Sequence, residues 1–415
     1  MRTGVSRYQL LALMAGIFAV GSEELVVSPL LAAIAGDLGT SIAGAGTSVA
    51  VYGLATALGA LVFAPIGDRV DRRTCLLVAS ALFIVGTILC ATAPALPLLL
   101  VGRAAAGLAT GVFVPAAYAF VGENVPYDQR ARIMGIVVSA WSLSLVLGVP
   151  AGALIGGLFG WRSVFWILAV VGAMVAALLA FQSTSRLPSA PLQEGEAGAD
   201  ADDAETAVTG VNARVALLVA LIGATFLNML GFYGMYTYIG TALHDRFDAD
   251  PWIVGAMILS YGIGFALVSV GGRWADRFDK TRLLLVLLGA LTAVLIGLPA
   301  ALPHPYVLAP AMFVWGVLQG FAVTLLSTVL SEMMPGRRAA IMAIYSLAVN
   351  IAVASGAFAL GPVFEKWGFF GLALCCAGVT LAGALALAVV ELASRRGTAE
   401  QEPHDESQDQ PCPDL

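Results

Sequence analysis

The sequence predicts an all-α membrane protein with twelve transmembrane helices in two similar six-helix bundles. Of the 415 residues, 59% are hydrophobic and only 12% are charged, which is about half the charged fraction of a soluble domain. The hydrophobic residues form long runs that are separated by short charged segments. One such segment, residues 67–72, returns as residues 275–280, which indicates an internal duplication of the kind that builds two-lobed membrane proteins.

The hydrophobic runs have the length of bilayer-spanning helices, which need about 20 residues each. Helices are required because lipid offers no hydrogen-bond partner to free backbone N–H and C=O groups. We expect the spans at residues 8–35, 44–66, 74–94, 97–122, 132–159, 163–183, 214–243, 251–272, 283–302, 306–333, 339–364 and 369–393.

The basic residues predict the orientation of the chain. With both termini inside, the outer loops hold only Arg162, Arg246 and Lys366 of the 21 Lys and Arg residues, and Arg103 lies within a span. Because basic residues accumulate on the cytoplasmic side of a membrane, we expect both termini in the cytoplasm.

Two acidic segments rich in Ala, Gly or Pro interrupt the hydrophobic pattern. Their composition cannot form a packed core, so we expect a flexible cytoplasmic linker at residues 184–213 and a disordered cytoplasmic tail at residues 394–415. The chain then divides into an N-terminal bundle at 1–183 and a C-terminal bundle at 214–393.

The duplicated loop carries charges with matching acidic partners. Arg72 can pair with Glu123 at the inner end of span 4, and by symmetry Lys280 can pair with Glu332. We expect these pairs to be conformational latches that form in one state and break in another. The alternative is simple positive-inside topology with loop turns. The expected latch comprises Asp68, Arg69, Arg72, Glu123, Asp276, Arg277, Lys280 and Glu332.

Three charged residues lie inside spans of the first half. An arginine within the membrane is costly, so Arg103 needs a partner, or it reaches the outer interface instead. Glu24 has Gly21 and Ser28 about one helical turn away, a small and polar face that suits a cavity. Burial disfavours the charged form of a carboxyl group, so Glu24 could exchange a proton near neutral pH. A structural role is the alternative, and it is favoured for Glu23, although either could carry the proton.

Span 5 contains a stripe of glycines with a four-residue spacing, Gly148, Gly152, Gly156 and Gly160. Such a face lets a neighbouring helix approach closely. Pro150 removes a backbone donor and permits a bend.

The second half offers hydroxyl and amide groups for a substrate cavity. Aromatic side chains with hydroxyls suit planar amphipathic compounds, although an aromatic interface belt explains the last tyrosines equally well. The amides could instead hold helices together. The expected cavity residues are Asn228, Tyr233, Tyr236, Gln319 and Asn350.

Over residues 8–393 the chain resembles the major facilitator superfamily, specifically its twelve-span drug:proton antiporter branch. The resembling motifs are both copies of the charged loop, Arg103-x-x-x-Gly107, the glycine stripe, Gly21-Ser22-Glu23-Glu24-Leu25 and Tyr236-Thr237-Tyr238-Ile239. Asp71 and Asp279 stand where the family usually has glycine. The resemblance implies the major facilitator fold, proton coupling through Arg103, and an antiporter motif that comprises Gly148, Pro150, Gly152 and Gly156.

We therefore expect a proton-coupled antiporter of the bacterial cytoplasmic (inner) membrane that exports small amphipathic compounds by alternating access. Glu24 would alternate between protonated and substrate-bound states, with Arg103 tuning its affinity for protons. An exporter of sugars, amino acids or an endogenous metabolite stays open. A nutrient symporter or a non-transporting receptor is less favoured.

No enzyme is expected, because the sequence has no phosphate-binding Gly–Lys loop and no metal-ligand spacing. No cofactor, metal or nucleic-acid partner is expected either. The expected partners are a small-molecule substrate, protons and the lipid bilayer, and the protein is expected to be a monomer.

Overall fold

The computed structural model describes residues 6–67, 69–181, 204–247, 251–271, 279–334 and 337–399. Every regular element in these ranges is helical. The elements are α1 (Arg7–Leu25), α2 (Val27–Asp37), α3 (Ile42–Gly67), α4 (Arg72–Ala91), α5 (Leu96–Asn124), α6 (Tyr127–Leu143), the π-helix η1 (Ser144–Gly148), α7 (Val149–Phe159), α8 (Trp161–Ala180), α9 (Ala204–Phe247), α10 (Pro251–Gly271), α11 (Lys280–Ala301), α12 (Pro305–Met333) and α13 (Arg338–Ala399).

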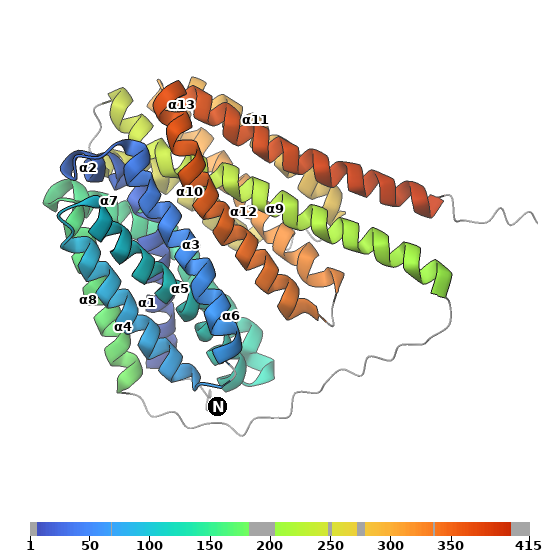
Figure 1. The fold of residues 1–415 in the computed structure, drawn as a ribbon, viewed down its shortest axis with the longest axis horizontal. Coiled ribbons are helices and arrows are strands. Elements are labelled where there is room, and N and C mark those ends of the chain that lie inside the picture. The colour runs from blue at the N-terminus through green and yellow to red at the C-terminus, as the bar shows by residue number, and fades with distance from the viewer. Residues whose placement is uncertain are drawn as a thin grey trace, which may run out of the picture.

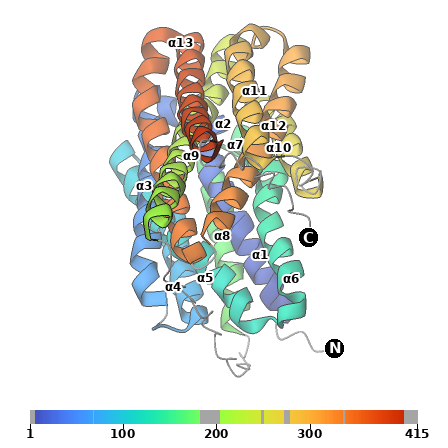
Figure 2. The same ribbon diagram turned by 90° about the vertical axis from the view of Figure 1, so that its right-hand side faces the viewer.

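The helices form two bundles, α1 to α8 and α9 to α13 (Figures 1 and 2). Nine helices in the described ranges are individually long and apolar enough to cross a membrane, or ten if the bent pair α1–α2 is one span. The shorter apolar helix α10 adds a span. The 62-residue α13 holds two spans that meet at Gly368, where φ is 64°. The described helices are therefore consistent with the twelve expected spans, and the all-α prediction is confirmed.

Within the part of the chain that the structure describes, two spans are irregular, and each contains a proline at the irregularity. Helices α1 and α2 meet at an angle of 51°, because Pro29 has no N–H to donate to the carbonyl of Leu25, four residues earlier. In span 5 the N–H of Val149 bonds to the carbonyl of Ser144, which makes the wide turn η1 directly before Pro150.

The segments expected to be linker and tail begin or end inside helices. Helix α9 starts at Ala204 and so takes in the last part of the stretch 184–213, while α13 continues to Ala399. The rest of both segments, residues 184–203 and 400–415, lies outside the described residues.

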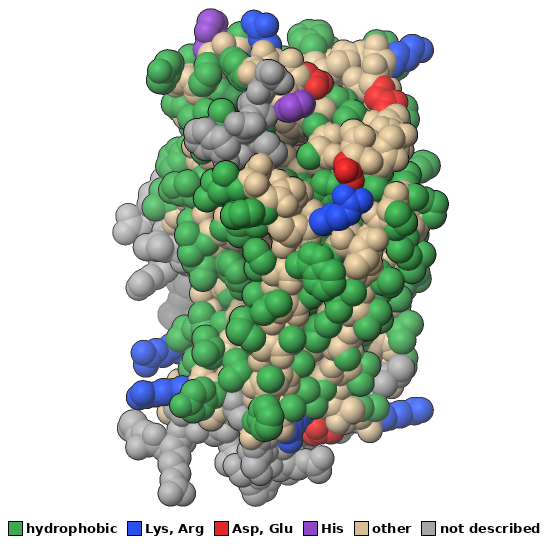
Figure 3. All heavy atoms as spheres, turned by 90° about the vertical axis from the view of Figure 1, so that its left-hand side faces the viewer, with side chains coloured by type: hydrophobic (Ala, Val, Ile, Leu, Met, Phe, Trp, Pro, Cys, Tyr) green, Lys and Arg blue, Asp and Glu red, His purple; other side chains and the backbone are tan. Residues whose placement is uncertain are grey.

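The outer surface has the polarity that a membrane requires. Figure 3 shows hydrophobic side chains over the middle of one side of the molecule and most charged side chains near its two ends. The end at which α1 begins and Arg72 lies is called the Arg72 face, and the opposite end, at which α2 finishes, is called the Asp37 face. The ribbons of the two bundles diverge toward the Arg72 face (Figure 1).

The bundles are in contact toward the Asp37 face. The Ser28 hydroxyl on α2 donates a hydrogen bond to the carbonyl of Tyr236 on α9. Gly240, one turn further along α9, has the Ser28 backbone so near that a Cβ there would overlap it. The N–H of Ala43 on α3 donates to Glu365 on α13 at 2.8 Å. The structure therefore shows the state in which the bundles are closed at the Asp37 face.

Candidate transport site

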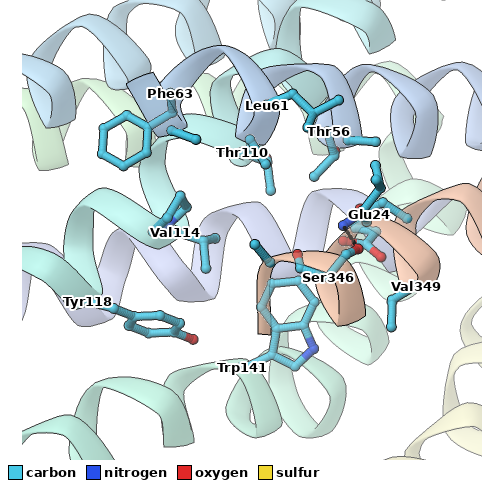
Figure 4. Close-up of a pocket in the computed structure, with 18 of the residues that line it drawn as sticks. Glu24, Thr56, Leu61, Phe63, Thr110, Val114, Tyr118, Trp141, Ser346 and Val349 are labelled. Atoms are coloured by element: carbon cyan, nitrogen blue, oxygen red, sulfur yellow. Dashed lines mark hydrogen bonds between the residues drawn. The ribbon is translucent and has the colours of Figure 1, made fainter. Parts of the chain in front are cut away.

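A cavity of about 480 Å³ lies between the two bundles. Its first-bundle walls come from α1, α3, α5 and α6, and α9 and α13 supply the other side (Figure 4). The walls are predominantly apolar, and Glu24 is the only charged side chain among the described residues that line them. The polar members of the lining are Glu24, Thr56, Thr110, Tyr118, Trp141, Tyr233, Ser346 and Asn350.

Glu24 connects the two bundles. Its carboxylate accepts a hydrogen bond of 2.6 Å from the Tyr233 hydroxyl on α9. Both side chains are buried within the protein, with Glu24 6% and Tyr233 8% exposed. A proton or ligand that binds to Glu24 therefore changes a hydrogen bond between the two bundles.

Arg103 pairs with Glu23 rather than with Glu24. The guanidinium and the Glu23 carboxylate form a fully buried ion pair. Arg103 also donates to the Glu23 carbonyl at 2.9 Å and to the Ser48 carbonyl at 3.2 Å. Its Cζ lies 4.2 Å from the centroid of the Tyr52 ring. The alternative in which Arg103 reaches the outer interface is therefore wrong, since Arg103 is 0% exposed inside the first bundle.

The two adjacent glutamates differ because consecutive residues of an α-helix point about 100° apart. Glu23 points into the first bundle, where Arg103 neutralises it. Glu24 points to the interface between bundles. Helix α1 thus carries one carboxylate in an ion pair inside the first bundle and one carboxylate that lines the cavity between the bundles.

The predicted cavity residues are only partly brought together. Tyr233 and Asn350 line the 480 Å³ cavity, while Tyr233 and Gln319 line a neighbouring one. Tyr236 lines neither and packs with its ring centroid 5.5 Å from that of Phe232. Asn228, which is 2% exposed, also lines neither cavity.

Sequence reasoning missed several polar lining residues in the first bundle, such as Thr56, Tyr118 and Trp141. A signal for one of them was present. Tyr52 and Thr56 are spaced by four in an otherwise apolar span, which places both on one helix face.

Three of the stripe glycines pack against the bent first span. A Cβ on Gly148 would overlap Ser22, one on Gly152 would overlap Val26, and one on Gly156 would overlap Leu30. The three partners also have a four-residue spacing, so the two helices fit along their length. Gly160 is not part of this contact; it ends α7 with φ 82° and has no atom within 4 Å of a Cβ placed there.

Pro150 lies at the bundle interface, where a Cβ on Gly255 of α10 would lie 3.4 Å from its Cα. The glycine face and Pro150 thus contact different neighbours. The first packs span 5 against α1 and α2, and the second packs it against the other bundle.

Both expected latch pairs exist as ion pairs. Arg72 Nε is 2.7 Å from Glu123, and Lys280 Nζ is 2.6 Å from Glu332. The first joins α4 to α5 and the second joins α11 to α12, so each lies within one bundle. Arg69 is exposed in the turn before α4. The remaining latch residues, Asp68, Asp276 and Arg277, lie outside the described residues.

The two aspartates that replace family glycines cap the helices that follow them. Asp71 accepts from the N–H of Thr74 at the start of α4. Asp279 accepts from the N–H groups of Thr281 and Arg282, both at 3.0 Å, at the start of α11. A side chain oxygen satisfies otherwise free helix donors, and the duplication has kept this device in both halves.

The family model of the Major Facilitator Superfamily matches residues 13–357. The chain belongs to the major facilitator superfamily. Membership makes this member a transporter and not an enzyme, and its multi-pass helical fold agrees with bacterial transporter relatives.

Relatives of this major facilitator protein carry different names. It is 40% identical over 373 residues to an uncharacterized MFS-type transporter, YwfA, of Bacillus subtilis, covering 90% of this chain and 89% of the relative. It is 29% identical to a chloramphenicol resistance protein of Streptomyces lividans, covering 77% and 80%. It is 26% identical to a probable sugar efflux transporter of Mannheimia succiniciproducens, covering 88% and 89%.

The fold is also found among solved structures. A peptide transporter POT, solved in complex with sulfate, superposes with a TM-score of 0.74 over 94% of this chain and 95% of its own. The sequence identity is 16%, so this likeness concerns the fold alone.

Proposed function

We propose that this major facilitator protein is a proton-coupled antiporter that exports small amphipathic compounds by alternating access. The observation that carries the proposal is the position of Glu24, the one charged group in the described lining of the interbundle cavity. The mainly apolar walls suit hydrophobic parts of a substrate, while the carboxylate suits a cationic or hydrogen-bonding part.

Coupling follows from competition at Glu24. An ionised Glu24 attracts a substrate cation or donor, and a proton that binds there removes that attraction. Because Tyr233 of the second bundle donates to the same carboxylate, the occupant of Glu24 also affects the contact between bundles. A proton and a substrate that prefer different states can then drive exchange.

Arg103 and Glu23 support this role from within the first bundle. Their pair carries no net charge, and Arg103 also holds the α1 backbone through the Glu23 carbonyl. We assign to this pair the positioning of Glu24, and to Arg103, whose guanidinium is bound to the adjacent Glu23, the tuning of the proton affinity of Glu24.

We extend the proposal to the orientation in the membrane, the role of the two ion pairs and the oligomeric state. The Arg72 face is cytoplasmic in a bacterial inner membrane, with both termini and the acidic linker on that side. The ion pairs Arg72–Glu123 and Lys280–Glu332 bias the conformational equilibrium, and the transporter works as a monomer.

The test uses the purified protein in liposomes that contain a fluorescent pH probe. A compound added outside drives protons out through an antiporter, so the lumen becomes alkaline, whereas a symporter makes it acidic. Protein-free liposomes correct for membrane-permeable bases. The panel comprises lipophilic cations, neutral amphipathic drugs and simple sugars.

Glu24→Gln should abolish the compound-dependent pH change. Asp128→Asn is the matched control, because it removes an exposed carboxylate at the Arg72 face. Proton movement that persists in Glu24→Gln contradicts the assignment of Glu24. Lumen acidification contradicts antiport, and a response to sugars alone would favour export of sugars, the activity named for one relative.

A further inference from the structure

A second cavity, of about 210 Å³, lies beside the transport cavity on the side of the second bundle. Its walls come mainly from α9, α10, α12 and α13. The residues that line both cavities are Trp141, Tyr233, Ser346 and Val349. The two spaces therefore meet at Tyr233, the residue that donates its hydrogen bond to Glu24.

Aromatic rings form one wall of this second cavity. The rings of Phe232 and Tyr261 stack with 5.7 Å between centroids and 24° between planes. Trp315 supports both from behind, with centroid distances of 5.6 Å to Phe232 and 4.9 Å to Tyr261. Such packed rings make a rigid surface against which another ring can stack.

Two residues that line this cavity each carry a buried polar atom that finds no hydrogen-bond partner among the described residues. These atoms are Nε2 of Gln319 and the hydroxyl of Tyr261, on side chains that are 1% and 0% exposed. A buried donor without a partner is destabilising, and such groups are rare in native proteins. Since both residues line the cavity, a bound molecule could supply the missing acceptor.

We propose that this cavity is a subsite for an aromatic ring that carries a hydrogen-bond acceptor, while the cationic or polar end of the same molecule lies beside Glu24. A cavity of roughly 150 Å³ already holds a benzene molecule, so the space suffices for a ring with a small substituent. The substrate class is then arylalkyl cations with a carbonyl-like group on the ring. The inference rests on the proposed function for the role of Glu24.

Three probe compounds separate the contributions of the cation, the ring and the acceptor to binding. The first is 4-acetylbenzyltrimethylammonium, which has the cation, the ring and the acceptor. The second, benzyltrimethylammonium, lacks the acceptor, and the third, tetraethylammonium, lacks the ring as well. Affinities are measured by titration calorimetry with the full chain in lipid nanodiscs.

The variant Gln319→Leu has a similar volume and removes the amide. It should weaken binding of the acetyl probe about tenfold, which is the effect of one lost hydrogen bond to a buried donor. The affinities for the other two probes should not change. Tyr261→Phe keeps the ring and gives a second measurement, in case the first variant is affected by packing.

Glu24→Gln should weaken the binding of all three cations by a similar factor. If the wild-type protein binds the acetyl and unsubstituted probes equally or binds neither, or if Gln319→Leu weakens all three probes, the subsite is wrong. A subsite effect without proton coupling in the liposome experiment would retain the subsite and overturn the proposed function. Coupling without a subsite effect would do the reverse.

Stability without ligand gives an independent readout. A purely structural Gln319 would lower the melting temperature when replaced. If Gln319 instead binds a ligand, Gln319→Leu should raise the melting temperature of the ligand-free protein. The substitution removes a buried donor that the empty protein leaves without a partner.

Discussion

The backbone N–H of Ala43, near the start of α3, donates a 2.8 Å hydrogen bond to the carboxylate of Glu365 on α13. The negative charge of Glu365 lies at the positive end of the α3 dipole. Since α3 and α13 belong to different bundles, this contact is made only while the Asp37 face is closed.

We therefore predict that Glu365→Ala favours opening at the Asp37 face. An exposed bond of this kind contributes about 1 kcal/mol, so the population of the open state should rise about fivefold. Spin labels on the exposed residues Ser41 and Lys366 would report the distance between bundles. Asp245→Ala is the control: it removes an exposed carboxylate of α9 and should leave the distances between the labels unchanged. Equal distance distributions in all three proteins would contradict the prediction.

The adjacent glutamates should separate stability from coupling. Glu23→Gln leaves the buried charge of Arg103 without its counter-ion, which should cost about 3–5 kcal/mol. Glu24→Gln keeps an acceptor for Tyr233 and should cost much less. Thermal unfolding in detergent measures both variants, and a double variant, Glu23→Leu with Arg103→Met, should regain most of the stability. A larger loss in Glu24→Gln than in Glu23→Gln would reverse the two assignments.

The contact of Gly152 with Val26 predicts a rescue experiment. A Cβ at Gly152 overlaps Val26, so Gly152→Ala should lower stability by about 1–3 kcal/mol. The double variant with Val26→Ala should recover part of this loss because space is restored. Gly135→Ala in α6 is the control, since nothing lies within 4 Å of a Cβ there. If Val26→Ala gives no recovery, the glycine is required for another reason.

The two ion pairs at the ends of their bundles offer a charge-reversal test. Glu123 and Glu332 are half-exposed, so each pair should contribute only about 0–1 kcal/mol to unfolding. If they bias the conformational equilibrium, Glu123→Arg should reduce transport several-fold with little change in melting temperature. Combining it with Arg72→Glu should restore transport. A loss that the reversal does not restore would indicate another role for the loop.

The paired residues of the latches could be predicted from the sequence because the duplication repeats both partners, the basic residue after 208 residues and the glutamate after 209. Each pair also joins neighbouring helices, so no long-range geometry was needed. The partner of Arg103 could not be predicted in this way. Glu23 and Glu24 point about 100° apart, and which of them faces Arg103 depends on the rotation of α1. That rotation depends on packing against helices distant in sequence, such as the contact of Ser22 with Gly148.

The cavity residues of the second bundle show the same limit. Tyr233 and Tyr236 are three residues apart and lie near the same helix face, so the sequence assigned both to the cavity. The structure places Tyr236 among Phe232 and Tyr261 instead. The bend after α1 did have a local signal in Pro29, whose missing N–H interrupts the helix.

The turn at Gly368 has a consequence for biosynthesis. With φ 64° and ψ −167°, this residue occupies a backbone region that is almost restricted to glycine. It reverses the chain between the last two hydrophobic segments without an intervening loop. Any contact between these two segments is local in sequence, so closing it costs little chain entropy, and we expect the two segments to pair early as the chain is made and folds.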